Sequence, residues 1–200
     1  MMKHILITFF YLISFTCHSQ NIVYADSVFN DFSKGLFKQF VIEESDVKIA
    51  DFKTELKNWI GLYFRNSKAV IDSETDNMMI LKIRLHDYAG AVLIFDFKDE
   101  KMRVSIYDRS IESLNAFGVI INSDIKSTFR DIRASTESFT YAQGIMNKGW
   151  RSVVVNDKHD NKIIKSNFDY NKVQLTVQRI DAMTESIKSI DFNKASSSNW

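Results

Sequence analysis

Between Met78 and Tyr107 the chain alternates apolar and polar residues in three successive runs, and no other feature constrains the fold as strongly. Alternation with a period of two residues is typical of β-strands with one buried face. Short turns at residues 88–90 and 99–100 separate the runs, so neighbouring strands run antiparallel. The sequence therefore predicts an antiparallel meander with one covered face, made of these side chains: Met79, Leu81, Ile83, Leu85, Ala91, Leu93, Phe95, Phe97, Met102, Val104 and Ile106.

Two amphipathic helices are expected to cover that face. Apolar residues recur at helical spacing in residues 51–65, where Asp51 is placed to cap the N-terminus. They recur again in residues 171–191, where Asn171 and Gln174 have the spacing of a capping box. We therefore expect an α+β fold in which an antiparallel β-meander sheet carries both helices on one face.

Several shorter elements surround this framework. Strands are predicted at residues 22–24, 36–42 and 68–71, and residues 72–77 read as an acidic turn before the meander. Further along, residues 123–133 suggest a short helix, and residues 152–155 and 162–165 suggest a hairpin.

The N-terminus resembles a secretory signal peptide. Lys3 precedes an apolar run at residues 5–15, which is too short for a membrane span of about 20 residues, and polar residues follow it. We expect residues 1–19 to be removed, leaving one domain at residues 20–193 and a flexible tail at 194–200, in a periplasmic or secreted protein. Lipidation at Cys17 is an alternative route.

Removal of that leader changes which functions the composition allows. The remaining chain has 25 basic and 25 acidic residues, no thiol, and only His86 and His159. It therefore excludes disulfides, cysteine nucleophiles and cysteine-containing zinc sites. A neutral chain also argues against nucleic acid as a partner, since backbone phosphates require a basic footprint.

Three partial motifs lack the residues that their chemistry requires. Residues 72–83 begin like a calcium loop but have Asn77 and Ile83 where Gly and Glu are needed. Residues 144–151 have the glycine spacing of a phosphate loop without its Lys and Ser/Thr, and residues 157–161 read as a solvated turn. The sequence thus predicts no metal, no cofactor and no catalytic residue.

The polar side of the meander is the remaining candidate site. Its binding residues are predicted to be Lys82, Arg84, His86, Arg103 and Tyr107. One alternative is a solvated face with cross-strand ion pairs, and another is that residues 109–169 cover this face.

Residues 36–108 resemble a known family. The segment contains a helix of the form Glu55-Leu56-x-x-Trp59-Ile60, a short Lys68–Ile71 segment, and Met102-Arg103-Val104 before an aromatic strand end. It is similar to a family of uncharacterised exported bacterial domains with a TATA-box-binding-protein-like fold. The resemblance implies an antiparallel sheet with helices on one face and implies no activity.

These observations favour an exported, non-catalytic domain that binds a protein, a glycan or an envelope component. Two alternatives stay open. One is a metal-free hydrolase with carboxylate chemistry in a cleft between helix and sheet, and the other is a lipid-tethered envelope protein.

Overall fold

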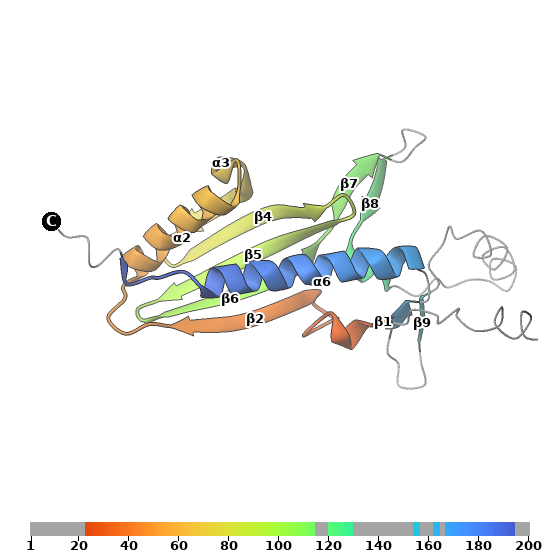
Figure 1. Cartoon of the computed structure of the whole chain (residues 1–200), viewed down its shortest axis with the longest axis horizontal. Coiled ribbons are helices and arrows are strands. Elements are labelled where there is room, and N and C mark those ends of the chain that lie inside the picture. The colour runs from red at the N-terminus through yellow and green to blue at the C-terminus, as the bar shows by residue number, and fades with distance from the viewer. Residues whose placement is uncertain (1–22, 115–119, 130–153, 157–161, 165–166, 195–200) are drawn as a thin grey trace, which may run out of the picture.

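The computed structural model describes residues 23–114, 120–129, 154–156, 162–164 and 167–194. Its main sheet has five antiparallel strands in the order β2-β6-β5-β4-β3 (Figure 1). The strands are β2 (Leu36–Glu43), β3 (Ile71–Thr75), β4 (Met78–His86), β5 (Ala89–Lys98) and β6 (Lys101–Arg109). The predicted meander is confirmed as β4-β5-β6, and β2 and β3 are added at its two edges.

Two long helices lie on the same face of this sheet, α2 (Ile49–Tyr63) and α6 (Asn167–Lys188) (Figure 1). The α+β fold with helices on one face is therefore confirmed. Trp59 of α2 donates its indole N–H to the Ser186 hydroxyl of α6 at 2.9 Å, which fixes the two helices side by side. Asp51 does cap α2, but from its first turn, where the carboxylate accepts the backbone N–H of Lys48 at 3.2 Å.

The core lies between the sheet and the two helices. Every inward residue of the predicted meander is buried, and Phe52, Leu56 and Ile60 of α2 are fully buried against them. Four residues of the predicted stripe of α6 are buried as well: Val173, Ile180, Met183 and Ile187. The alternating and helical patterns thus describe two surfaces of one apolar layer.

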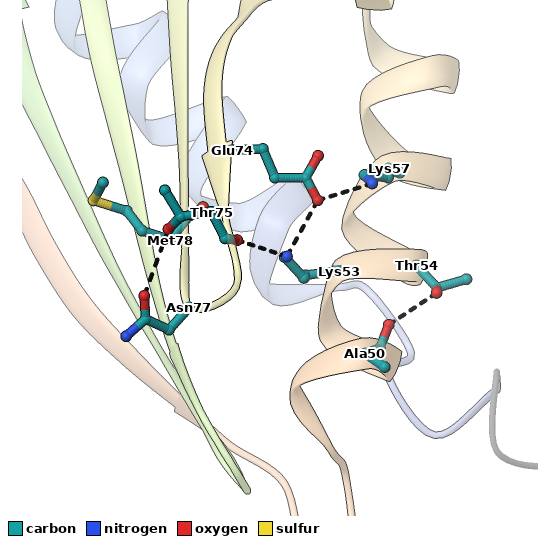
Figure 2. A network of polar contacts seen from close by, with 8 residues as sticks. All are labelled: Ala50, Lys53, Thr54, Lys57, Glu74, Thr75, Asn77 and Met78. Atoms are coloured by element: carbon teal, nitrogen blue, oxygen red, sulfur yellow. Dashed lines mark hydrogen bonds and ion pairs between the residues drawn. The ribbon is translucent and has the colours of Figure 1, made fainter.

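A polar anchor fixes α2 to the edge strand β3 (Figure 2). Lys57 and Lys53 of α2 place their ammonium groups 2.9 and 3.2 Å from Oε1 of Glu74. Lys53 also donates to the carbonyl oxygen of Thr75 at 2.7 Å. Hydrogen bonds from Lys57 and Lys53 lower the pKa of Glu74, although partial desolvation opposes them.

The prediction for residues 68–77 is wrong. Residues Ser67–Val70 form one helical turn, α3, and the strand β3 begins only at Ile71. The Asn66 side chain caps this turn by accepting the backbone N–H of Ala69 at 3.3 Å. Asp72 and Glu74 lie on this strand, which pairs with β4, whereas Asp76 and Asn77 do form a turn as predicted. Asp72 and Glu74 each also pair with lysines of neighbouring elements.

The predicted start of the last helix, at residue 171, is also wrong. Because α6 begins at Asn167, Asn171 and Gln174 lie inside it and form no capping box. The helix ends at Lys188, a few residues before the predicted 191.

The remaining elements are short. They are β1 (Val23–Tyr24), η1 (Ala25–Ser27), β7 (Ile111–Leu114), β8 (Ile120–Ser123), α4 (Ile125–Thr128), β9 (Val154–Asn156) and β10 (Lys162–Ile164). The predicted hairpin is confirmed by antiparallel pairing of β9 with β10, and β1 extends it to three strands. α4 lies within the helix predicted at 123–133, of which residues 130–133 are outside the described part.

The leader at residues 1–19 and residues 195–200 of the tail also lie outside the described residues. Among the residues that are described, no helix combines the length and apolar character that a membrane span requires.

Candidate functional site

The sheet has a second face, opposite α2 and α6, which we call the open face. Strand register sets its side chains in cross-strand rows, because directly paired residues point to the same side. One row is Val41, Arg103, Asp96 and Met78, and the next is Gln39, Ser105, Ile94 and Ile80. The third row contains Tyr107, Val92 and Lys82, and the fourth contains Arg109, Gly90 and Arg84.

The centre of the open face is aliphatic. Met78, Ile80, Val92 and Ile94 are half-buried there, although α2 and α6 lie on the other side of the sheet. Val41, on the edge strand β2, leaves 52% of its surface exposed. The alternation that predicted a polar outer surface therefore leaves an apolar strip along the middle of β4 and β5.

Ion pairs surround this strip. Arg103 donates from Nη2 and Nε to one carboxylate oxygen of Asp96, at 2.8 and 3.1 Å. Lys101 pairs with Glu43 at 2.9 Å, and Lys82 pairs with Asp72 at 2.7 Å. Two of the predicted binding residues, Lys82 and Arg103, are thus on the open face with their charges already paired, while Tyr107 lies half-buried beside them.

The predicted placement of His86 on the open face is wrong. A register shift between Arg84 and His86 turns the imidazole toward the helices, where Nε2 lies 2.7 Å from the hydroxyl of Thr176 on α6. Nδ1 accepts the backbone N–H of Tyr88 at 3.2 Å. Burial, with the nearby charge of Arg179, lowers the pKa of His86. His86 therefore belongs to the contact between β4 and α6.

One end of the open face contains a hollow of about 670 Å³. Its lining residues are Arg84, Arg109, Ser110, Ile111, Glu112 and Asn122. Arg84 was predicted as a binding residue, whereas Arg109 was not. Both arginines are cross-strand partners of Gly90, so they share a row across three strands. The only sequence signal for Arg109 is its position two residues after Tyr107 on the same strand face.

The first residues of β7 cover part of this end. A side chain at Gly90 would bring its Cβ within 2.7 Å of a methyl group of Ile111, so only glycine lets Ile111 pack on the strand. Arg84 donates from Nη2 to the carbonyl oxygen of Glu112 at 3.1 Å. Part of the 109–169 region therefore does contact the open face, at the arginine row.

Asp108 is the most perturbed carboxylate near the site. Burial raises its pKa to about 6, although backbone N–H donors from Lys126 and Ile125 act in the opposite direction. One oxygen accepts the N–H of Ile125 at 3.2 Å and the other accepts that of Lys126. Both oxygens are thus used to fix the start of α4 on β6, which is a structural role.

The acidic residues at 72–76 do not converge. Asp72 pairs with Lys82 on the open face, while Glu74 pairs with Lys53 and Lys57 on the helix side. Within the described ranges, no group of three or more His, Cys, Asp or Glu side chains is arranged to bind a metal ion.

These elements define an α+β protein whose antiparallel sheet is covered by helices on one face. A solved TBP-like protein from Parabacteroides distasonis is similar to this chain, with 8% identity, a TM-score of 0.42, and coverage of 78% of this chain and 96% of that one. It has the fold description that the sequence resemblance implied for residues 36–108. At that identity and TM-score the likeness carries no further argument, and the fold rests on the strand order above. No family model and no curated protein matches the chain.

Proposed function

We propose that this chain is an exported, non-catalytic binding domain whose open face takes a protein partner. The observation that carries the proposal is the aliphatic strip of Met78, Ile80, Val92 and Ile94, bordered by paired charges. Protein interfaces have this anatomy, with an apolar centre inside a polar rim.

The charges around the strip favour a protein over a glycan. Arg103 and Lys82 are neutralised by Asp96 and Asp72, so a partner gains by covering apolar area without having to supply matching charges. Sugar rings are commonly bound by stacking on aromatic side chains. Tyr107 is the one aromatic residue in the rows of the open face defined above, which is a small platform for a glycan.

Site-specific photo-crosslinking tests this proposal. A photoreactive amino acid is placed at Tyr107, on the open face, and in a second protein at Leu62, which is 90% exposed on α2. The protein is then irradiated in the envelope of the source cells. The proposal expects a discrete crosslinked protein from position 107 and none from position 62. Equal products from both positions, or none from position 107, would contradict it.

Substitutions on the open face provide the second test. Arg103→Ala removes the pairing with Asp96, and Tyr107→Ala removes the aromatic side chain. Once the crosslinked partner is identified, Tyr107→Ala should weaken its binding about tenfold, the usual effect of losing a large aromatic side chain from an interface. Arg103→Ala should weaken binding less, because Arg103 lies in the polar rim. Leu62→Ala is the matched control and should leave binding unchanged.

The export proposal is supported by the leader pattern at residues 1–19. Mass spectrometry of the protein purified from its source cells tests it. A mature N-terminus at Gln20, as glutamine or pyroglutamate, supports cleavage by signal peptidase. An acylated Cys17 would support the lipid-tethered alternative, and an intact residue 1–19 segment would contradict export.

A further inference from the structure

We propose that Arg84 and Arg109 form a binding site for a phosphomonoester group at the end of the open face. The inference rests on the proposed binding role of this face and adds a ligand class to it. It also assigns a function to Arg109, which the sequence analysis did not single out.

The strand register places the two arginines together. Arg84 on β4 and Arg109 on β6 are both partners of Gly90 on β5, so their Cα atoms are two strand spacings apart, roughly 10 Å. Side chains of one row point to the same side of the sheet. Gly90 contributes no side chain to the row and Ile111 of β7 packs over it, so the surface between the two arginines is apolar.

The walls of the hollow fix one arginine and provide neutral polar groups, together with one acidic residue, Glu112. Arg84 donates to the carbonyl oxygen of Glu112, which restricts its guanidinium at the rim. Ser110 and Asn122 line the same hollow and bring a hydroxyl and a carboxamide. Both are side chains that donate hydrogen bonds to phosphate oxygens.

The charge at this end differs from the charge on the rest of the open face. Lys82, Lys101 and Arg103 each have a carboxylate partner between 2.7 and 2.9 Å away. Among the residues that the structure describes, no ion pair involves Arg84 or Arg109, and Glu112 contributes its backbone oxygen. The two guanidinium charges exceed the single carboxylate charge of Glu112 in the same hollow, so an anion that reaches both arginines is favoured.

A phosphomonoester suits this pair of arginines by its charge and by the hydrogen bonds that it accepts. It carries a charge of about −1.5 to −2 at pH 7, enough to neutralise two guanidinium groups. Each guanidinium is a planar fork that donates two parallel N–H bonds to a phosphate. The hollow of about 670 Å³ exceeds a single ion, so the phosphate is expected to terminate a larger molecule, either a small metabolite or a lipid headgroup.

Titration calorimetry of the full chain tests the site. The ligands are inorganic phosphate and glycerol 3-phosphate. Vesicles of phosphatidylcholine with and without phosphatidic acid, assayed by co-sedimentation, test the lipid source. Saturable binding of either soluble ligand, or of phosphatidic acid vesicles alone, supports the proposal and identifies the source. Absence of binding in all three arms would overturn it.

Matched variants then assign the binding to these two residues. Arg84→Gln and Arg109→Gln should each weaken binding at least tenfold, because each removes charge-assisted hydrogen bonds. Arg65→Gln is the control, since Arg65 is an exposed arginine directly after α2, which lies on the opposite side of the sheet. An equal loss in all three variants would overturn the proposal as nonspecific charge attraction. Thermal unfolding of each variant checks that it is folded, and Arg109→Gln remains informative if Arg84→Gln does not fold.

The pH dependence and the crosslinking experiment separate this inference from the proposed function. Affinity should fall between pH 7.5 and 5.5, as the phosphate gains its second proton near pH 6; an unchanged affinity would overturn binding of the dianion. If phosphate binding is absent while crosslinking from Tyr107 persists, this inference fails and the binding face stands. If phosphate binds but Tyr107 gives no crosslink, this inference stands and the proposed protein partner of the open face fails.

Discussion

The imidazole of His86 lies in a continuous set of hydrogen bonds between β4 and α6. Nδ1 accepts from the backbone of Tyr88, so in the neutral ring Nε2 carries the proton and donates to Thr176. Thr176 in turn donates its hydroxyl proton to the carbonyl oxygen of Lys172 at 2.9 Å. A protonated imidazole could no longer accept from Tyr88, which agrees with the lowered pKa of His86.

This arrangement predicts that His86 makes the fold less stable as the pH falls. The folded pKa is below the unfolded value of 6.5, so this contribution is complete above pH 6.5 and declines below it, as the unfolded chain takes up the proton. We expect His86→Gln to lose less stability than the wild type between pH 7.5 and 5.5, measured by urea unfolding. A wild type and variant with parallel pH profiles would contradict this.

The effect of Asp108 on stability must be separated from that of His86. Asp108 titrates in the same pH range, and its effect on stability has the opposite sign. Its pKa is raised to about 6, so the folded state takes up the proton first and stability increases as the pH falls through that value. Asp108 is present in both the wild type and His86→Gln, so the difference between them isolates the histidine. Thr176→Val, which leaves the imidazole N–H without its acceptor, should lower stability by about 1 kcal/mol at pH 7.5.

Two glycines with opposite surroundings give a matched pair of predictions. A Cβ at Gly90 would lie 2.7 Å from Ile111 and 3.1 Å from the carbonyl oxygen of Ile83, whereas a Cβ at Gly61 meets nothing within 4 Å. Gly90→Ala should therefore destabilise the protein by about 1–3 kcal/mol. Gly61→Ala lies inside α2 and should stabilise it by up to about 1 kcal/mol. Thermal unfolding of both variants measures these changes in stability. Equal changes in the two variants would contradict the packing described for Gly90.

At the scale of elements, the pattern of apolar and polar residues within one strand or helix predicted well which side chains are buried. Leu81 and Ile83 alternate with Lys82 in the sequence, and the structure buries the first two and exposes the third. His86 departs from that pattern because a register shift after Arg84 turns it to the other face, and no residue pattern signals the shift. Local periodicity therefore predicts a face only as far as the ladder stays regular.

Contacts between elements explain the other errors. The acidic segment forms a strand because its backbone pairs with β4, and Glu74 also meets Lys53 and Lys57 of a helix there. Arg109 was missed because its neighbour Arg84 is 25 positions earlier in the chain and meets it only through the register of β4, β5 and β6. Both relations depend on three-dimensional packing, which a single sequence does not encode locally.

The Glu74 anchor gives a prediction for the attachment of α2 to β3. Glu74→Gln removes both ion pairs while retaining the hydrogen bond from Lys53 to Thr75. We expect a loss of about 1 kcal/mol at low ionic strength, smaller at high salt. The lowered pKa of Glu74 means that its contribution is complete above pH 4.5 and is lost as the pH falls through the folded pKa.

Chemical denaturation at two salt concentrations measures the effect of Glu74→Gln. Glu185→Gln is the matched control, because in the described part of the chain Glu185 pairs with Lys188 alone, on the exposed side of α6. The control should change stability by less than about 0.5 kcal/mol. A similar loss in both variants would show that the anchor adds nothing beyond a surface ion pair.

At the scale of the whole molecule, the described residues share one cluster of buried hydrophobic side chains. The cluster includes Val23 and Phe29 near the start of the described chain, the inward side chains of the sheet, and Phe192 near its end. Phe192 packs on Phe52 of α2 with ring centroids 5.0 Å apart. The first and last parts of the described chain thus stabilise the same core, as expected if residues 20–193 form one domain.

A single shared core predicts one cooperative unfolding transition. In a protein with Trp150→Phe and Trp200→Phe, the fluorescence comes from Trp59, which contacts α6. It should report the same midpoint as far-ultraviolet circular dichroism, which follows the sheet and helices. Phe192→Ala, at the far end of the chain, should lower both midpoints together and destabilise the protein by about 3–5 kcal/mol, because Phe192 is almost fully buried. If the substitution moved the Trp59 transition and left the circular dichroism transition in place, residues 20–193 would contain two independent units. Coincident shifts would mean that the open face belongs to a single cooperative unit, so that a partner bound there stabilises the whole unit.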